Sequence, residues 1–135
     1  MAQTLRGVAT INIWAEDHSA AVAWYSKLLD IKPYFERPGY AEYRIGDYQT
    51  ELGIIDRKYA PHMTFPKDPA GAVIYWHVDD VHATYGHLLS QGATSLQEPE
   101  DRGHGFVTAA VIDPFGNTLG VMYNPHYAEV RRHQE

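Results

Sequence analysis

The order of apolar and polar residues predicts two similar units, each opening with a strand and a helix. Residues 9–14 and 72–78 alternate as half-buried strands do, so residues two apart share a face. An acidic pair follows each run, Glu16-Asp17 after the first and Asp79-Asp80 after the second. Good helix formers follow at 18–30 and 81–91, the first with apolar residues three and four positions apart. The chain therefore begins each half with the same two predicted elements.

An aspartate marks the corresponding point of each half. Asp17 or Ser19 can cap the first predicted helix, and Asp80 stands at the same point of the second half, 63 positions further along. Gly92 can end the second helix. Such self-similarity indicates a duplicated unit.

Three β-like runs follow each predicted helix. The runs are 34–37, 40–45 and 50–55 in the first half, and 94–98, 106–112 and 118–123 in the second. Each half is therefore strand, helix and three strands, which predicts an α+β fold of duplicated βαβββ modules.

The stretch Asp-Pro-Phe-Gly-Asn at 113–117 predicts a tight hairpin between the last two runs. Pro114 presets φ for a turn, and Gly116 and Asn117 tolerate the left-handed backbone that a reversal needs. Apolar, β-rich residues stand on both sides of this stretch.

We expect one domain that spans all 135 residues. Residues 59–71 contain three prolines and are typical of a linker or lid loop. We expect the basic end of the chain to be frayed. The predicted parts are module one at about 7–57, a linker at about 58–71, module two at about 72–124 and a C-terminal tail at 125–135.

The amino-acid composition argues against several classes of partner and site. The net charge is −6 and the sequence shows no basic stripe, which argues against a nucleic-acid partner. There is no cysteine, so disulfides and thiolate metal sites are excluded. No apolar run approaches the roughly 18 residues of a membrane span, and no signal region is recognisable. We expect a cytoplasmic protein without a membrane partner.

One face of each predicted strand is more mixed in character than the other and suits a concave binding site with a few polar groups. The alternative is an ordinary sheet face that is polar because it meets water. Large apolar side chains on the mixed face favour a covered site. The candidate ligand-binding residues are Asn12, Trp14, Tyr43, Glu51, Tyr75, His77, His104, Phe106 and Met122.

In its order of motifs, the chain resembles the vicinal oxygen chelate superfamily of glyoxalase, bleomycin-resistance and extradiol-dioxygenase proteins. The resemblance covers about residues 7–123. It is carried by the 113–117 turn, the Val-Asp-Asp-Val stretch at 78–81, the Trp-Tyr and Leu-Leu pairs of the first helix, and the duplication. It implies two modules whose sheets form a curled mixed sheet around a central cavity, assembled as a homodimer.

The resemblance also implies where a divalent metal would be held, with one ligand on the first and last strand of each module. These positions are Thr10, Glu51, Val73 and Gly120, and only Glu51 is a plausible ligand. We therefore expect no metal and no other cofactor. A displaced metal site of Glu51, His77 and His104 is the alternative.

The expected function is metal-free binding or sequestration of an aromatic or drug-like organic molecule, as in the bleomycin-resistance proteins. Aromatic residues and Met122 would contact the ligand, while Asn12, Glu51, His77 and His104 would orient its polar groups. An acidic chain favours a neutral or cationic ligand.

Two other functions stay open. One is a metal-dependent lyase, isomerase or dioxygenase with a displaced metal site. The other is a purely structural or interaction module with a filled cavity. The sequence shows no nucleophile elbow, phosphate loop or dinucleotide fingerprint, and we assign no catalytic residue.

Overall fold

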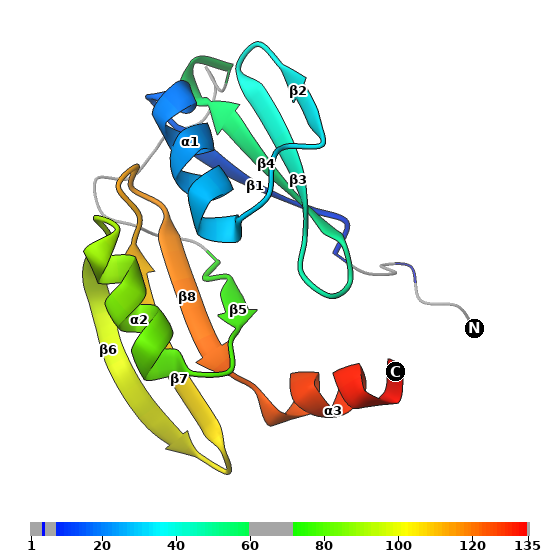
Figure 1. Ribbon diagram of the computed structural model, residues 1–135, viewed down its shortest axis with the longest axis vertical. Helices are drawn as coiled ribbons and strands as arrows, with labels where there is room; N and C mark the ends of the chain where they lie inside the picture. The colour runs from blue at the N-terminus through cyan, green and yellow to red at the C-terminus, as the bar shows by residue number, and fades with distance from the viewer. Residues whose placement is uncertain (1–3, 5–7, 60–71, 135) are drawn as a thin grey trace. The chain divides into compact units, whose positions relative to one another are not determined.

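Figure 1 shows a computed structural model of the protein, which describes Thr4, residues 8–59 and residues 72–134. The chain divides into two compact units, Met1–Met63 and Thr64–Glu135. The predicted linker begins within a short 3-10 helix, η1 (Arg57–Tyr59), and its remaining residues lie outside the described ones. None of the helices in the described parts is long and apolar enough to cross a membrane.

The first unit is a four-stranded mixed sheet with one helix against it. Its sheet has the order β1-β4-β3-β2, with β1 parallel to β4 and the other neighbours antiparallel. The elements are β1 (Thr10–Ala15), α1 (His18–Leu29), β2 (Phe35–Arg37), β3 (Tyr40–Ile45) and β4 (Thr50–Asp56).

The second unit repeats this arrangement and adds a helix at its end. Its sheet has the order β5-β8-β7-β6, again with the first pair parallel and the others antiparallel. The elements are β5 (Tyr75–His77), α2 (Val81–Ser90), β6 (Thr94–Gly103), β7 (Phe106–Ile112), β8 (Thr118–Tyr123) and α3 (Pro125–Gln134).

The predicted fold class is confirmed, because both units run strand, helix and three strands and form open mixed sheets. The C-terminal tail predicted at 125–135 contains the helix α3, and the prediction that its basic end at 131–133 is frayed is wrong because these residues lie within the helix. The side chain of Asn124 accepts the backbone N–H groups of His126 and Tyr127, and Pro125 takes the first helical position, where its missing N–H costs nothing.

The two aspartates that mark the repeat start the two main helices. The Asp17 carboxylate accepts the N–H of Ala20 at 3.1 Å, and the Asp80 carboxylate accepts the N–H of Ala83 at 3.0 Å. Each satisfies one of the N–H groups that a helix start leaves without a partner. Of the two predicted caps for α1, Asp17 is therefore the one used.

The hydrophobic core of each unit lies between its sheet and its helix. Tyr43 and Ile54 are fully buried in the first unit, and Leu88 and Val111 in the second. Burying an apolar side chain of this size contributes about 1.5 to 3 kcal/mol. Small residues such as Ala21 let the helix approach the strands closely.

The predicted hairpin turn after β7 is confirmed. Asp113 is only 3% exposed, and one of its carboxylate oxygens accepts the N–H groups of Phe115 at 2.9 Å and Asn117 at 2.8 Å. The amide of Asn117 also donates to the carboxylate at 3.0 Å. A buried carboxylate is tolerated here because donors surround it.

The side chain of His18 connects α1 to the neighbouring strand β4. Its Nε2 atom donates to the carbonyl of Ile54 at 2.9 Å, which ties the first turn of α1 to β4. A carbonyl can only accept, so the neutral ring carries its proton on Nε2.

Candidate functional site on the open sheet faces

In each unit one face of the sheet is covered by a helix; we call the opposite face the open face. In the first unit the hydroxyl of Tyr43 contacts the hydroxyl of Ser26 and the carbonyl of Val22, both on α1, which identifies the helix-covered face. Residues opposite one another in the ladder share a face. By register, the open face of the first unit carries Thr10, Asn12, Trp14, Phe35, Arg37, Tyr40, Glu42, Arg44, Glu51, Gly53 and Ile55.

The prediction that Tyr43 contacts a ligand is wrong in this arrangement. Its side chain is 0% exposed and lies under α1, with Ala41 and Ile45 on the same face of β3. Burial also raises the pKa of the Tyr43 phenol. Tyr43 is therefore a core residue, and Asn12, Trp14 and Glu51 are the predicted residues of this unit that share the open face.

A carboxylate held by two phenols lies on this open face and was missed in the sequence. Tyr34 and Tyr40 each donate a hydrogen bond to Glu42, one to each carboxylate oxygen. The guanidinium of Arg44 lies over the Tyr34 ring, 4.3 Å from its centroid. Alternation along β3 places Tyr40, Glu42 and Arg44 on one face, but only the pairing of β2 with β3 brings Tyr34 to them.

These hydrogen bonds change how the groups titrate. The phenol of Tyr34, followed by that of Tyr40, holds the pKa of the Glu42 carboxyl below its usual range, and Arg44 acts in the same direction. Burial, and after it the bond to Glu42, raises the pKa of Tyr40 to about 12. Glu42 is thus a carboxylate and Tyr40 a neutral donor at neutral pH.

In the second unit the phenol of Tyr85 on α2 donates to the hydroxyl of Ser95, which stands opposite Val111 in the ladder. The helix-covered face therefore includes Val111, Ala109 two residues before it, and their ladder partners Leu119 and Val121. By register, the open face carries Tyr75, His77, Gln97, Glu100, Phe106, Thr108, Ala110, Thr118, Gly120 and Met122. The structure thus brings the predicted residues Tyr75, His77, Phe106 and Met122 onto one face.

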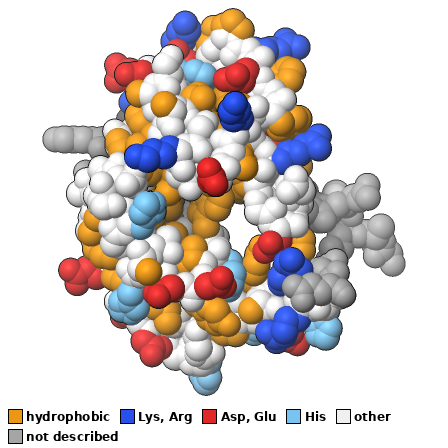
Figure 2. All heavy atoms as spheres, in the orientation of Figure 1, with side chains coloured by type: hydrophobic (Ala, Val, Ile, Leu, Met, Phe, Trp, Pro, Cys, Tyr) orange, Lys and Arg blue, Asp and Glu red, His pale blue; other side chains and the backbone are white. Residues whose placement is uncertain are grey.

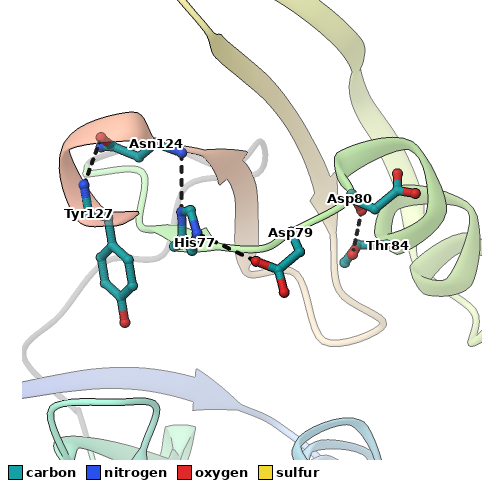
Figure 3. A network of polar contacts seen from close by, with 6 residues as sticks. All are labelled: His77, Asp79, Asp80, Thr84, Asn124 and Tyr127. Atoms are coloured by element: carbon teal, nitrogen blue, oxygen red, sulfur yellow. Dashed lines mark hydrogen bonds and ion pairs between the residues drawn. The ribbon is translucent and has the colours of Figure 1, made fainter. Parts of the chain in front are cut away.

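The His77 ring lies on this face but is occupied by its own chain. Its Nδ1 atom accepts the backbone N–H of Asn124 at 3.1 Å, and its ring stacks on Tyr127 with centroids 4.5 Å apart and planes 15° apart (Figure 3). The side chain is 13% exposed. In this arrangement His77 holds α3, and its Nδ1 atom is not open to a ligand.

His104 occupies the tip of the hairpin between β6 and β7. It has a left-handed backbone with φ of 54°, between two glycines that also have positive φ. The tip comes directly before Phe106 in the chain. The Phe106 ring meets the His126 ring edge-on, with their centroids 5.4 Å apart. His104 is exposed, so the structure adds no contact that supports its predicted role.

The ladder corrects one of the four metal positions. Asn12 stands opposite Gly53, and Tyr75, which is 63 positions after Asn12, stands opposite Gly120. Gly53, and not Glu51, is therefore the counterpart of Gly120 in the first module.

Neighbouring side chains fill the space beside both glycines. A Cβ at Gly53 would lie 2.4 Å from the side-chain oxygen of Asn12, and a Cβ at Gly120 would lie 2.6 Å from the Tyr75 ring. Real Cβ contacts are essentially never that short. Neither position has a side chain that could reach an ion.

The residues present do not fit the divalent metal that the resemblance implies. Thr10 and Val73 at the remaining positions offer at best a neutral hydroxyl. Among the described residues, no group of three or more His, Asp or Glu side chains could hold a metal ion.

Charged side chains of the described residues are mixed over the visible surface. Figure 2 shows basic and acidic side chains interspersed, with apolar side chains between them.

The family model for the Glyoxalase/Bleomycin resistance protein/Dioxygenase superfamily matches residues 7–121. The chain belongs to this superfamily. No curated protein gives a sequence match. The superfamily match ends within β8, so α3 lies outside it.

Solved structures of this superfamily share the fold. A glyoxalase-related enzyme from Fulvimarina pelagi is 20% identical with a TM-score of 0.74, over 90% of both chains. A superfamily member from Sphaerobacter thermophilus is 20% identical with a TM-score of 0.71, over 87% of this chain and 97% of its own. A glyoxalase/bleomycin resistance protein from Catenulispora acidiphila is 22% identical with a TM-score of 0.60, over 88% of this chain and all (100%) of its own. At these identities the comparison establishes the fold.

Proposed function

We propose that this protein binds a small aromatic organic molecule on the open faces of its sheets and does so without a metal ion. The observation that carries the proposal is the filled space beside Gly53 and Gly120. Where metal-dependent members of the superfamily would hold an ion, this chain has two glycines overlain by Asn12 and Tyr75.

The side chains of the open faces suit such a ligand. Tyr75 is 40% exposed although it is large and aromatic, and it shares its face with Met122, which stands opposite His77 in the ladder. Rings offer stacking, and a thioether adapts to the shape of an apolar partner. On the open face of the first unit, ionised Glu42 and the amide oxygen of Asn12 offer acceptors for the polar groups of a ligand bound there.

We further propose that the ligand is neutral or cationic. The chain has a net charge of −6, and the carboxylate of Glu42 is kept ionised by two phenols. The net negative charge repels an anionic ligand at long range. Glu42 adds a cost at contact, because an anionic group of the ligand would lie next to its carboxylate. A homodimer in the cytoplasm is part of the same proposal, and light scattering on purified protein tests the dimer.

Binding is tested with a panel of aromatic compounds matched in size, with cationic, neutral and anionic members. We expect saturable binding by isothermal titration calorimetry, strongest for cationic or neutral compounds. Tyr75→Ala should weaken it about tenfold, the effect of losing one stacking partner. Tyr85→Phe, on the helix-covered side, is the matched control and should bind normally. No saturable binding across the panel would remove the proposal.

The metal question has its own measurement. Elemental analysis of protein purified without chelators should find no stoichiometric first-row metal. A stoichiometric metal that disappears in Glu51→Ala would instead favour a lyase, isomerase or dioxygenase with a displaced site.

A further inference from the structure

The C-terminal helix α3 lies beyond the residues that the superfamily model matches. The family model ends at residue 121, whereas α3 spans Pro125–Gln134. Its first turn is fastened to the open face of the second unit, at the end where β5 and β8 finish. Because α3 lies outside the family match and contacts the candidate binding face, we asked what it does there.

Two rings of α3 meet two residues of the open face. Tyr127 stacks on His77 at 4.5 Å, and His126 meets Phe106 edge-on at 5.4 Å. Pro125 lies beside Gly105, where a Cβ would be 3.1 Å from its ring. The start of α3 therefore covers part of the face on which we place the ligand.

The joint between β8 and α3 includes a hydrogen bond to the imidazole of His77. Asn124 caps α3 with its side chain, while its backbone N–H donates to Nδ1 of His77 at 3.1 Å (Figure 3). A backbone N–H can only donate, so Nδ1 must be without a proton. A proton on Nδ1 would turn this hydrogen bond into two N–H groups facing each other.

Within the described part of the second unit, the ionisable side chains in contact with the His77 ring are those of Asp79, Tyr123 and Tyr127. The carboxylate of Asp79, which is fully exposed, lies 3.9 Å from Nε2. Tyr123 on β8 and Tyr127 on α3 present rings at 5.2 and 4.5 Å, and phenols are uncharged near neutral pH. Asp79 attracts a charged imidazole on its Nε2 side but, being in water, attracts it weakly, and it does not restore the acceptor at Nδ1.

We propose that α3 is a proton-released cover of the binding face: it is docked while Nδ1 of His77 is unprotonated, and it detaches when His77 takes up a proton. Histidine is the side chain that changes charge between about pH 5 and 8. Lowering the pH through this range would uncover His77 and Phe106. The effect on ligand access rests on the proposed function, whereas the docking itself does not.

The test is hydrogen exchange of the amides of residues 124–130 without any ligand, expressed as protection factors at about pH 8 and about pH 5.5. In the wild type we expect protection to fall about tenfold at the lower pH, the effect of losing one hydrogen bond. His77→Asn places an oxygen near the Nδ1 position that accepts at both pH values. Its protection should therefore be independent of pH.

Two further variants separate His77 from other histidines. His87→Asn, on the exposed side of α2, and His126→Gln, in α3 itself, should both keep the fall seen in the wild type. Equal protection of the wild type at both pH values would overturn the proposal. So would a fall that persists in His77→Asn or disappears in His126→Gln. Since no ligand is used, absence of binding in the compound panel would leave this result unaffected.

Discussion

The ring of Tyr75 lies so close over Gly120 that a Cβ at Gly120 would be 2.6 Å from the nearest ring atom. The carbonyl of Ile74 would be only 3.0 Å from the same Cβ, and it is part of the backbone. In the first unit, a Cβ at Gly53 would meet the side-chain oxygen of Asn12 at 2.4 Å. The two glycines thus hold equivalent positions in the two ladders, but a side chain added at each would meet different neighbouring atoms.

Gly120→Ala should destabilise the protein more than Gly53→Ala. At Gly53 the Asn12 amide can rotate away and the Tyr40 ring, 3.1 Å from the Cβ, must give only slightly, whereas at Gly120 the Tyr75 ring must shift while a backbone carbonyl at 3.0 Å leaves little room. Overpacking of this kind costs about 1 to 3 kcal/mol, and we expect Gly53→Ala to cost less than about 1 kcal/mol. Urea unfolding of both variants measures the difference. Tyr75→Ala combined with Gly120→Ala should recover part of the loss, and equal costs for the two glycines would contradict this account.

Tyr43→Phe should lower stability without changing ligand binding. The variant removes the hydrogen bonds that the hydroxyl makes with Ser26 at 2.8 Å and with the Val22 carbonyl at 3.1 Å, at a cost of about 1 kcal/mol. Combining it with Ser26→Ala in a double-mutant cycle should show coupling, because the two hydroxyls are partners. A loss of binding in a stably folded Tyr43→Phe protein would show that this residue belongs to the site after all.

Asp113→Ala should be among the most damaging changes to the second unit. It leaves the N–H groups of Phe115 and Asn117 without their acceptor at a buried turn, which we expect to cost about 2 to 3 kcal/mol. Thermal and urea unfolding measure the loss. Glu98→Ala, an exposed acidic position on β6, should stay within about 0.5 kcal/mol of the wild type.

The ionised carboxylate of Glu42 should make the free energy of unfolding decrease as the pH is lowered. Its pKa is lowered in the folded protein, so its contribution is present above the ordinary glutamate value of about 4.3 and is lost as the pH falls through the lower folded value. The wild type should therefore exceed Glu42→Gln in unfolding free energy at pH 7, with the gap closing below about pH 4. Urea titrations at several pH values measure this. A gap that is the same at pH 3 and pH 7 would be inconsistent with it.

Alternation and turn chemistry were enough to predict the elements and the faces of most strands. The error at the metal position has a specific origin: Glu51 and Gly53 are two residues apart and share a face, so no pattern of burial distinguishes them. Only the ladder, which pairs Asn12 with Gly53, decides the matter. Long-range pairing of this kind is not encoded in local periodicity.

Other misses had signals that could have been used. Ala41, Tyr43 and Ile45 form an apolar i, i+2, i+4 series, which by itself places Tyr43 on the covered face. Asn124 followed by Pro125 is a common helix start. The hydrogen bond from Tyr34 to Glu42, in contrast, could not be predicted without knowing that β2 pairs with β3.

The ten-residue edge strand β6 has features that hinder its pairing with a strand of another chain. It ends the sheet order of the second unit and pairs with β7 through three register shifts. It also carries Pro99 and a run of charged residues. A long straight edge would offer its free backbone groups to a second chain, whereas bulges, proline and charge prevent such pairing. Straightening β6, by replacing Pro99 and the neighbouring charges with β-branched residues, would therefore be expected to promote aggregation before it altered any binding.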